Sequence, residues 1–194
     1  MKALEVLLFD DFTSLDVFGP IEVLYRLDGG VAVRYVSSTG GLISGSGGAR
    51  VWTEPLSESG DPDILLVPGG LGTRKLVEDG PTLKFIRATS QTARFVLSVC
   101  TGSALLAKAG VLSHRRATSN KLAWDWVVQQ SAEVEWVRKA RWVVDAKFYT
   151  SAGVSAGIDM ALGFVRDQVG IQVAESFARG LEYVWNREED QDPF

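Results

Sequence analysis

The sequence predicts a doubly wound α/β fold, in which helices cover both faces of a mostly parallel sheet within a single domain. Three observations lead to this prediction. Short runs of strand length recur along the chain and are apolar at nearly every position, as strands buried on both faces are. Segments of helical character separate these runs. A chain of 194 residues with 46% hydrophobic residues can also fill one large core.

The first half of the chain begins with an apolar run at residues 4–9, which we expect to form a buried parallel strand. Ser14 can cap the helix that follows, over residues 14–27, although Pro20 would kink a regular helix there. Residues 31–37 alternate and are β-branched, so they predict a second strand. The glycine-rich residues 40–48 indicate a tight hairpin.

The middle of the chain repeats the strand-then-helix pattern. Residues 63–67 predict a third strand, which ends at Pro68-Gly69-Gly70, and a helix over residues 80–92 follows it. Residues 95–99 predict the next strand, and residues 101–109 predict a helix that Gly110 would close as a C-cap.

The last third predicts a helix over residues 121–130, two short strands within residues 141–150, and closing helices over residues 153–170 and 173–185. Residues 187–194 are expected to be a frayed polar tail. The resulting order, β-α-β-β-α-β-α, is the pattern of a doubly wound sheet.

Composition excludes several classes of function. The net charge is −4 and Lys and Arg are dispersed, which argues against nucleic-acid and membrane partners. The N-terminal apolar stretch is too short for a signal peptide, no run is as long as a membrane span, and the chain has one cysteine, so we expect a cytoplasmic protein. No metal-ligand spacing or phosphate-binding glycine motif is present, so we expect neither metal nor cofactor.

The single cysteine, Cys100, is the strongest candidate for chemistry. It follows a predicted strand, with the small residues Ser98 and Gly102 two positions to either side, which is the steric requirement of a nucleophile elbow. A thiol there faces a helix N-terminus, which would lower its pKa. A buried core cysteine is the alternative interpretation.

A thiolate that adds to an electrophile needs hydrogen-bond donors. The Thr101 amide is one by position, and Pro68-Gly69-Gly70, which ends another strand on the same edge, can supply a second. A simple turn is the alternative reading of Pro-Gly-Gly.

The catalytic acid or base is expected to be a carboxylate. The only histidine, His114, follows the far end of the helix after Cys100, so we place it in a surface loop. Asp10, Asp11 and Asp16 all follow the first strand. Asp16 has apolar neighbours, and burial would raise its pKa, although an aspartate near a helix N-terminus is also favourable for the helix alone.

Four segments together resemble the DJ-1/PfpI (ThiJ/PfpI) superfamily and, within it, the isocyanide hydratase group: "LDVFGPIEVL", "DILLVPGG", "VCTGSALLAKAGVLSHRRATSNKLAW" and "YTSAGVSAGIDMALGFV". The resemblance covers essentially the whole chain and implies a flavodoxin-like fold. It implies cofactor-free hydration of isocyanides to N-formamides through a thioimidate. By this resemblance Cys100 is the nucleophile, Asp16 the acid and Thr101 the following threonine, with amides of Gly70 and Thr101 at the oxyanion position.

The resemblance also implies a homodimer with the site near the subunit interface, and it places the Asp16 segment and residues 151–157 close to the thiol. A regulator branch with a C-terminal helix-turn-helix shares "LDVFGP", but the chain ends at Phe194, so we do not expect such a module. Asn120 and Lys121 stand where relatives often carry His or an aromatic residue.

Two other functions remain open at this point. One is a glyoxalase- or deglycase-like enzyme that uses the same thiolate on an aldehyde. The other is a redox sensor without catalytic activity, in which Cys100 is oxidised.

Overall fold

The computed structural model describes residues 2–58 and 60–194, and within them an eight-stranded sheet forms the centre of the fold. Its strands lie in the order β3-β4-β2-β1-β5-β6-β10-β9. The pairs formed by β4, β2, β1, β5, β6 and β10 are parallel, and antiparallel strands β3 and β9 close the two edges. The strands are β1 (Lys2–Leu7), β2 (Val31–Ser37), β3 (Gly41–Ser44), β4 (Arg50–Pro55), β5 (Ile64–Val67), β6 (Phe95–Val99), β9 (Trp142–Asp145) and β10 (Phe148–Ser151).

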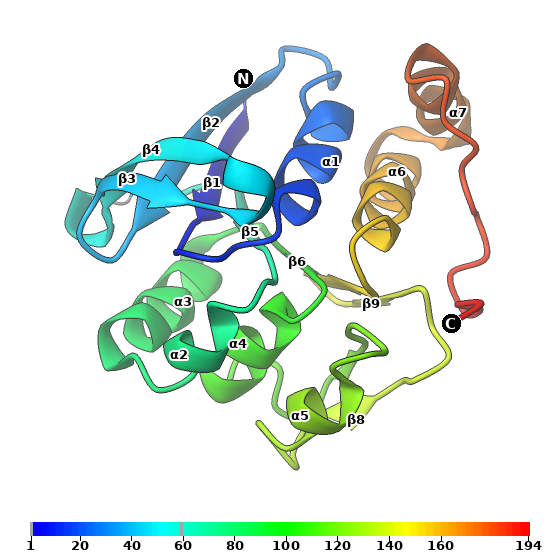
Figure 1. The fold of residues 1–194 in the computed structure, drawn as a ribbon. Coiled ribbons are helices and arrows are strands. Elements are labelled where there is room, and N and C mark those ends of the chain that lie inside the picture. The colour runs from blue at the N-terminus through cyan, green and yellow to red at the C-terminus, as the bar shows by residue number, and fades with distance from the viewer. Residues whose placement is uncertain (1, 59) are drawn as a thin grey trace.

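Helices cover both faces of this sheet (Figure 1), which confirms the predicted fold class. Helices α1, α6 and α7 pack together on one face, and α2, α3 and α4 pack on the other, with α5 beside α4. Their bounds are α1 (Ser14–Leu24), α2 (Thr73–Leu76), α3 (Gly80–Thr92), α4 (Gly102–Lys108), α5 (Trp124–Val128), α6 (Ala156–Val169) and α7 (Ile171–Gly180). None of the helices in the described part of the chain is long and apolar enough to cross a membrane.

The direction of winding reverses at β1. This strand pairs with β2 on one side and with β5 on the other, and β5 then pairs with β6. The carboxyl ends of β1, β5 and β6 therefore meet at one edge of the sheet. In open α/β sheets, ligands bind in the crevice at such a switch point.

The core explains why the central strands are so apolar. Every residue of β5 and residues 96–99 of β6 are buried, because helices cover both faces of the sheet at these strands. Glycines allow close approach where α6 crosses: a Cβ on Gly157 would lie 2.9 Å from the Val99 side chain, and a Cβ on Gly19 would lie 2.8 Å from Ile158. Helix α1 is thereby held against α6 and over the end of β6.

Several predicted elements differ in extent from those observed. The first helix ends at Leu24 rather than at residue 27 and continues through Pro20. The expected hairpin at residues 40–48 is part of a larger one, β3 and β4 with a 3-10 turn (Ser46–Gly48) between them. The helix expected at residues 121–130 is reduced to α5, and the closing helices are shorter than expected. A small parallel sheet of β7 (Arg116–Ala117) and β8 (Glu135–Trp136) was not predicted.

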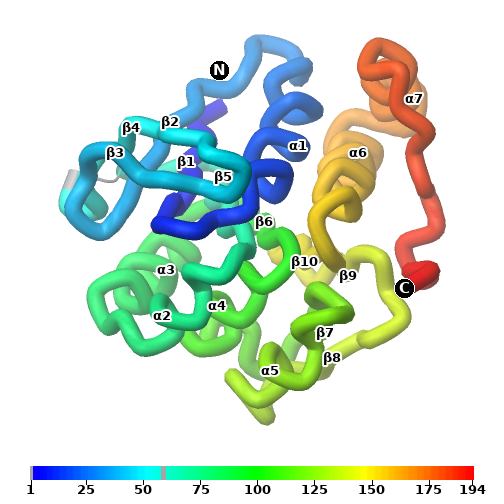
Figure 2. The backbone as a smooth tube through the Cα atoms, in the orientation of Figure 1, coloured from blue at the N-terminus to red at the C-terminus, as the bar shows by residue number. Residues whose placement is uncertain are grey.

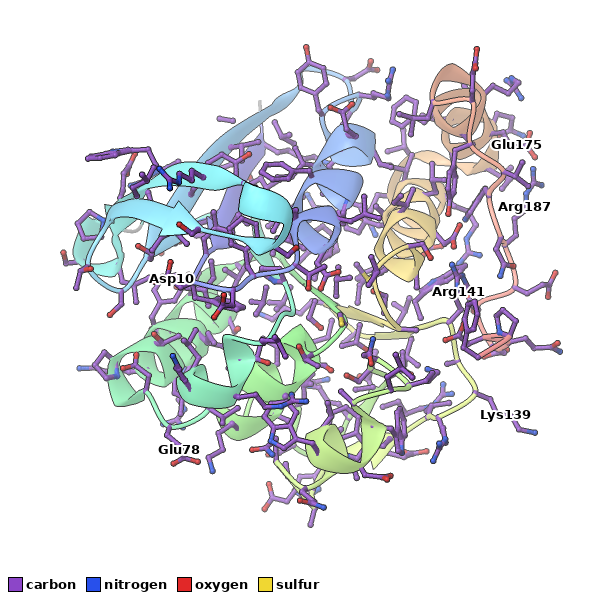
Figure 3. The ribbon with its side chains drawn as sticks, in the orientation of Figure 1. Asp10, Glu78, Lys139, Arg141, Glu175 and Arg187 are labelled. Carbon is purple, nitrogen blue, oxygen red and sulfur yellow. The ribbon has the colours of Figure 1, made fainter. Side chains whose placement is uncertain are left out.

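The C-terminal segment, expected to be frayed, is docked as far as Asp192. It returns from α7 alongside α6 toward β9 (Figure 2), where the Arg141 N–H donates to the Glu189 carbonyl at 2.7 Å. Figure 3 shows Arg187 beside Glu175 of α7, to which it forms an ion pair at 2.8 Å.

The docking is completed by a carboxylate. Asp192 forms ion pairs with Arg141 at 3.1 Å and with Lys121 at 3.6 Å. Beyond Asp192 the chain is exposed at its end, where Phe194 is 86% exposed. A polar composition thus reflects charge pairing here rather than disorder.

Candidate active site

Cys100 lies in the tight turn between β6 and α4. Its backbone φ is +59°, in the left-handed region that residues with a side chain rarely occupy and in which strain often marks functional sites. The close crossing of strand and helix depends on Gly102, because a Cβ there would lie 2.2 Å from the Val67 carbonyl oxygen. The small residue that the sequence placed two positions after the cysteine is therefore a steric requirement of the turn.

Three N–H groups donate hydrogen bonds to the Cys100 sulfur. They are the backbone N–H groups of Thr101 and Val154 and the side-chain amide of Asn120. Thr101 was expected, whereas Val154 and Asn120 were not identified as donors from the sequence. Gly153 makes room for the amide, since a Cβ on it would lie 2.5 Å from Asn120 Nδ2.

The segment after β10 is fastened to the turn by backbone hydrogen bonds. The Cys100 N–H donates to the Ser151 and Ala152 carbonyls at 3.2 and 3.1 Å, and this geometry delivers the Val154 N–H to the sulfur. Val154 itself has a φ of +43°, so a second strained residue borders the thiol. The expectation that residues 151–157 approach the thiol agrees with this arrangement.

Asp16 lies in the first turn of α1 with its side chain fully buried next to the thiol. Its Oδ2 accepts a hydrogen bond from the Gly69 N–H at 2.9 Å, and its Oδ1 has no N–H or O–H partner among the described residues. Burial raises the pKa of the Asp16 carboxyl to about 7, although the bond from Gly69 and the interaction with Cys100 oppose this rise. At neutral pH this group can therefore both accept and donate a proton.

The pKa of the thiol differs from the expectation. Burial, together with the negative charge of Asp16, raises the pKa of Cys100 to about 12, because the three hydrogen bonds offset only part of the effect. Cys100 is 6% exposed, and the desolvation of a buried thiolate outweighs the helix N-terminus that was expected to stabilise it. The resting thiol therefore keeps its proton at neutral pH, where the neighbouring carboxyl titrates.

Thr101 and Gly70 are connected to each other. The Gly70 N–H donates to Thr101 Oγ1 at 3.0 Å, and Thr73 Oγ1 lies 3.1 Å from the same oxygen and 2.7 Å from the Gly70 carbonyl. Gly70 has a φ of +136°, and a Cβ on it would lie 2.2 Å from the Asp11 carbonyl oxygen. The Gly70 N–H, expected to face the substrate, is thus engaged by the threonine hydroxyl, because the loop after β5 packs directly on the turn.

The other aspartates after the first strand do not share the position of Asp16. Asp10 accepts a hydrogen bond from the Ser44 N–H at 3.0 Å, Asp11 is exposed, and Figure 3 shows Asp10 at the side of the hairpin. Residues 12–14 lead into α1. Of the three aspartates, only Asp16, in the first turn of this helix, lies next to the thiol. As expected, His114 lies in the loop beyond α4. Its backbone N–H donates a hydrogen bond to the Glu133 carbonyl at 2.8 Å. The described residues contain no cluster of His, Cys, Asp or Glu suited to a metal ion.

Comparison with known proteins agrees with the fold. The chain is 37% identical to an isonitrile hydratase of Pseudomonas putida over 91% of this chain and 76% of that protein. It is 31% identical to a deglycase of Pyrococcus abyssi over 71% of this chain and 86% of that protein. A crystal structure of a ThiJ/PfpI family protein from Pseudomonas syringae superimposes with a TM-score of 0.82 at 28% identity, covering all of this chain and 77% of that one. The family model described as the DJ-1/PfpI family matches residues 1–167, and the chain belongs to this family.

Proposed function

We propose that the protein hydrates an isocyanide to an N-formamide, with Cys100 as the nucleophile and Asp16 as the acid and base. The observation that carries this proposal is the buried carboxyl of Asp16, with one oxygen lacking an N–H or O–H partner among the described residues, directly beside the only thiol of the chain. The similarity to an isonitrile hydratase supports the same assignment.

The first step activates the thiol. Asp16 and Cys100 are two buried acids in contact, so they titrate as a pair rather than as independent groups. The active form is the pair that holds one proton. As the sulfur approaches the substrate, its proton passes to the Asp16 carboxylate, and the hydrogen bonds from Thr101, Val154 and Asn120 stabilise the thiolate that forms.

The second step forms the sulfur–carbon bond. The terminal carbon of an isocyanide accepts the sulfur while one carbon–nitrogen π pair moves to the nitrogen, and the lone pair that this carbon already holds is left as a negative charge on it. Asp16 returns the proton to this carbon, which gives a thioimidate in which nitrogen and carbon remain doubly bonded. Because the new charge forms one bond away from the sulfur, the acid must lie next to the thiol, as Asp16 does.

The third step is hydrolysis. Water adds to the thioimidate carbon, and Asp16 accepts one of its protons and passes it to the nitrogen. The new hydroxyl group gives its remaining proton to Asp16 as it becomes the carbonyl. The carbon–sulfur bond then breaks, the N-formamide leaves, and the pair again holds one proton. The sum is the addition of one water molecule, with no oxidant or reductant.

A purified sample with an aryl isocyanide tests the proposal, because formamide formation can be followed by absorbance. We expect turnover by the wild type and a loss of at least about a thousandfold in Cys100→Ala, since removal of the nucleophile removes the covalent route. Absence of turnover in the wild type, or equal turnover in the variant, would contradict the proposal.

A second candidate is the addition of the same thiol to an aldehyde, which the similarity to a deglycase supports. Addition to an aldehyde puts the new charge on oxygen and calls for free amide donors, whereas the Gly70 N–H is engaged by Thr101. Methylglyoxal as a parallel substrate distinguishes the two enzymes. Peroxide treatment with mass spectrometry identifies a redox sensor, which would show oxidation of Cys100 and turn over neither substrate.

We also propose, as part of this function, a cytoplasmic homodimer formed through the face of α1 and α6. A cavity of about 280 Å³ lies on this face, lined by Leu15, Phe18, Ile158 and their neighbours, and Leu15 adjoins Asp16 in the chain. Light scattering on the wild type and on Leu15→Glu measures the oligomeric state, and a monomeric wild type would contradict the dimer.

A further inference from the structure

A guanidinium group lies on α2, an element that packs against the turn holding the thiol and that the proposed reaction does not use. Helix α2 begins at Thr73, whose hydroxyl lies 3.1 Å from that of Thr101, the residue after Cys100. The next residue of α2, Arg74, is exposed and turns toward α5. The thiol turn is therefore connected to this arginine through the contact of Thr101 with Thr73 and the peptide bond from Thr73 to Arg74.

Arg74 is held in place by an aromatic ring. Its guanidinium carbon lies 3.6 Å from the centre of the Trp126 ring on α5, which is close enough for a strong cation–π contact. A guanidinium stacked in this way has one face covered and keeps its N–H groups free at the edge. No carboxylate of the described side chains lies within ion-pair distance of it, so its charge is available to a ligand.

The charge of Arg74 reaches the thiol. Partial burial lowers the pKa of Arg74 from its usual range, while a negative charge on Cys100 acts in the opposite direction. The two groups are therefore within electrostatic range, and the arginine stays protonated at neutral pH because a guanidinium loses its proton only in strongly basic solution.

We propose that Arg74, fixed on Trp126, is a specificity-determining residue for the Cys100 site, and that the preferred substrate carries a carboxylate or a similar anionic group near its reacting carbon. The identification of that substrate as an isocyanide rests on the proposed function, whereas the preference for an anion does not. The side chain would bind the carboxylate through its free N–H groups, which form a fork that matches two carboxylate oxygens.

Turnover of a matched pair of substrates tests the preference. The pair is 4-isocyanobenzoate and 4-isocyanobenzamide, which differ in charge and little in size. We expect Arg74→Gln to raise KM for the benzoate about tenfold and to change KM for the amide less than about twofold, because one charge-assisted contact is lost. Arg74→Lys should recover part of the effect. Lys75→Gln, which removes the same charge from the exposed neighbouring residue of α2, is the control and should behave as the wild type.

Alkylation of the thiol tests the same proposal without any turnover. The chain has one cysteine, so the intact mass reports the reaction of Cys100 alone. The rate with iodoacetate, which is anionic, is divided by the rate with neutral iodoacetamide, and this ratio is normalised to free cysteine. We expect Arg74→Gln to lower the ratio about fivefold or more, while Lys75→Gln changes it less than about twofold.

The outcomes separate the two proposals. If the wild type hydrates neither isocyanide, the proposed function fails, and the alkylation ratio still decides the role of Arg74. An unchanged ratio in Arg74→Gln overturns the inference. An equal fall in both alkylation rates also overturns it, because Arg74 would then serve only to position the turn.

Discussion

At the residue scale, Asp16 and Cys100 each lie where burial makes the charged form costly. The pKa of Asp16 rises to about 7 and that of Cys100 to about 12, so the pair releases the first of its two protons near neutral pH. A carboxyl with a raised pKa lowers the stability of the fold, because the unfolded chain loses this proton near pH 4 whereas the folded chain retains it to about pH 7. The folded state therefore binds more protons between these pH values, and stability falls as pH rises through them.

Asp16→Asn separates this stability cost from catalysis. The variant removes the buried charge but keeps an oxygen that can accept the Gly69 N–H. At pH 8 we expect its free energy of unfolding to exceed that of the wild type by about 2 kcal/mol, about half of the full cost that the raised pKa implies. Near pH 4 the two proteins should be equally stable. Isocyanide turnover should fall at least about a hundredfold.

Denaturant unfolding at pH 4 and pH 8 measures the difference, with Asp10→Asn as the exposed control. A variant that is less stable than the wild type at both pH values would show that the Asp16 carboxylate is not a destabilising charge.

The sequence could predict two residues of the candidate site but not their titration. Cys100 and Asp16 follow the ends of strands β6 and β1. The strand–helix pattern of the sequence predicts a parallel sheet, in which such strand ends lie at the same edge. The depth of burial that reverses the expected fall in the thiol pKa depends on tertiary packing. Asn120 and Val154 could not be found in the same way, because each lies in a loop whose path depends on contacts with distant segments.

At the element scale, the turn between β6 and α4 requires a close crossing of backbones. The apolar strands were predicted because burial on both faces leaves a clear signal in the sequence. The short elements were missed or misjudged, among them β7, β8 and the true length of α5, because two to five residues carry little periodicity.

Gly102→Ala tests the steric demand of this turn. The new Cβ would lie 2.2 Å from the Val67 carbonyl oxygen, which is backbone and cannot move aside. We expect a loss of about 3 kcal/mol in the free energy of unfolding. Gly80→Ala is the matched control, because its Cβ would meet open space at the exposed start of α3, and it should stabilise the protein by up to about 1 kcal/mol. Equal stability of the two variants would show that the crossing tolerates a side chain.

At the scale of the whole molecule, the C-terminal segment connects α7 back to the sheet edge and to the segment that holds Asn120. Asp192 pairs with Arg141 and with Lys121, the residue after Asn120, and Arg141 also pairs with Asp159 of α6. Composition suggested a frayed tail because the sequence does not reveal which charges will be buried opposite one another.

Asp192→Asn measures the contribution of this docking. Both cationic partners are largely buried, so loss of the charge leaves them undercompensated. We expect the free energy of unfolding to fall by about 1.5–3 kcal/mol in thermal or denaturant unfolding. Asp190→Asn, an exposed site in the same segment, should change it by less than about 0.5 kcal/mol. Identical effects of the two substitutions would rule out the docked arrangement.

The most direct test of the shared proton is the rate at which iodoacetamide alkylates Cys100 between pH 5 and pH 9, in the wild type and in Asp16→Asn. For the wild type we expect the rate to rise through an inflection near pH 7, where Asp16 becomes able to accept the thiol proton, and then to level off. The inflection should be missing in Asp16→Asn. Superimposable profiles for the two proteins would contradict the account, because the thiol would then ionise without help from the carboxyl.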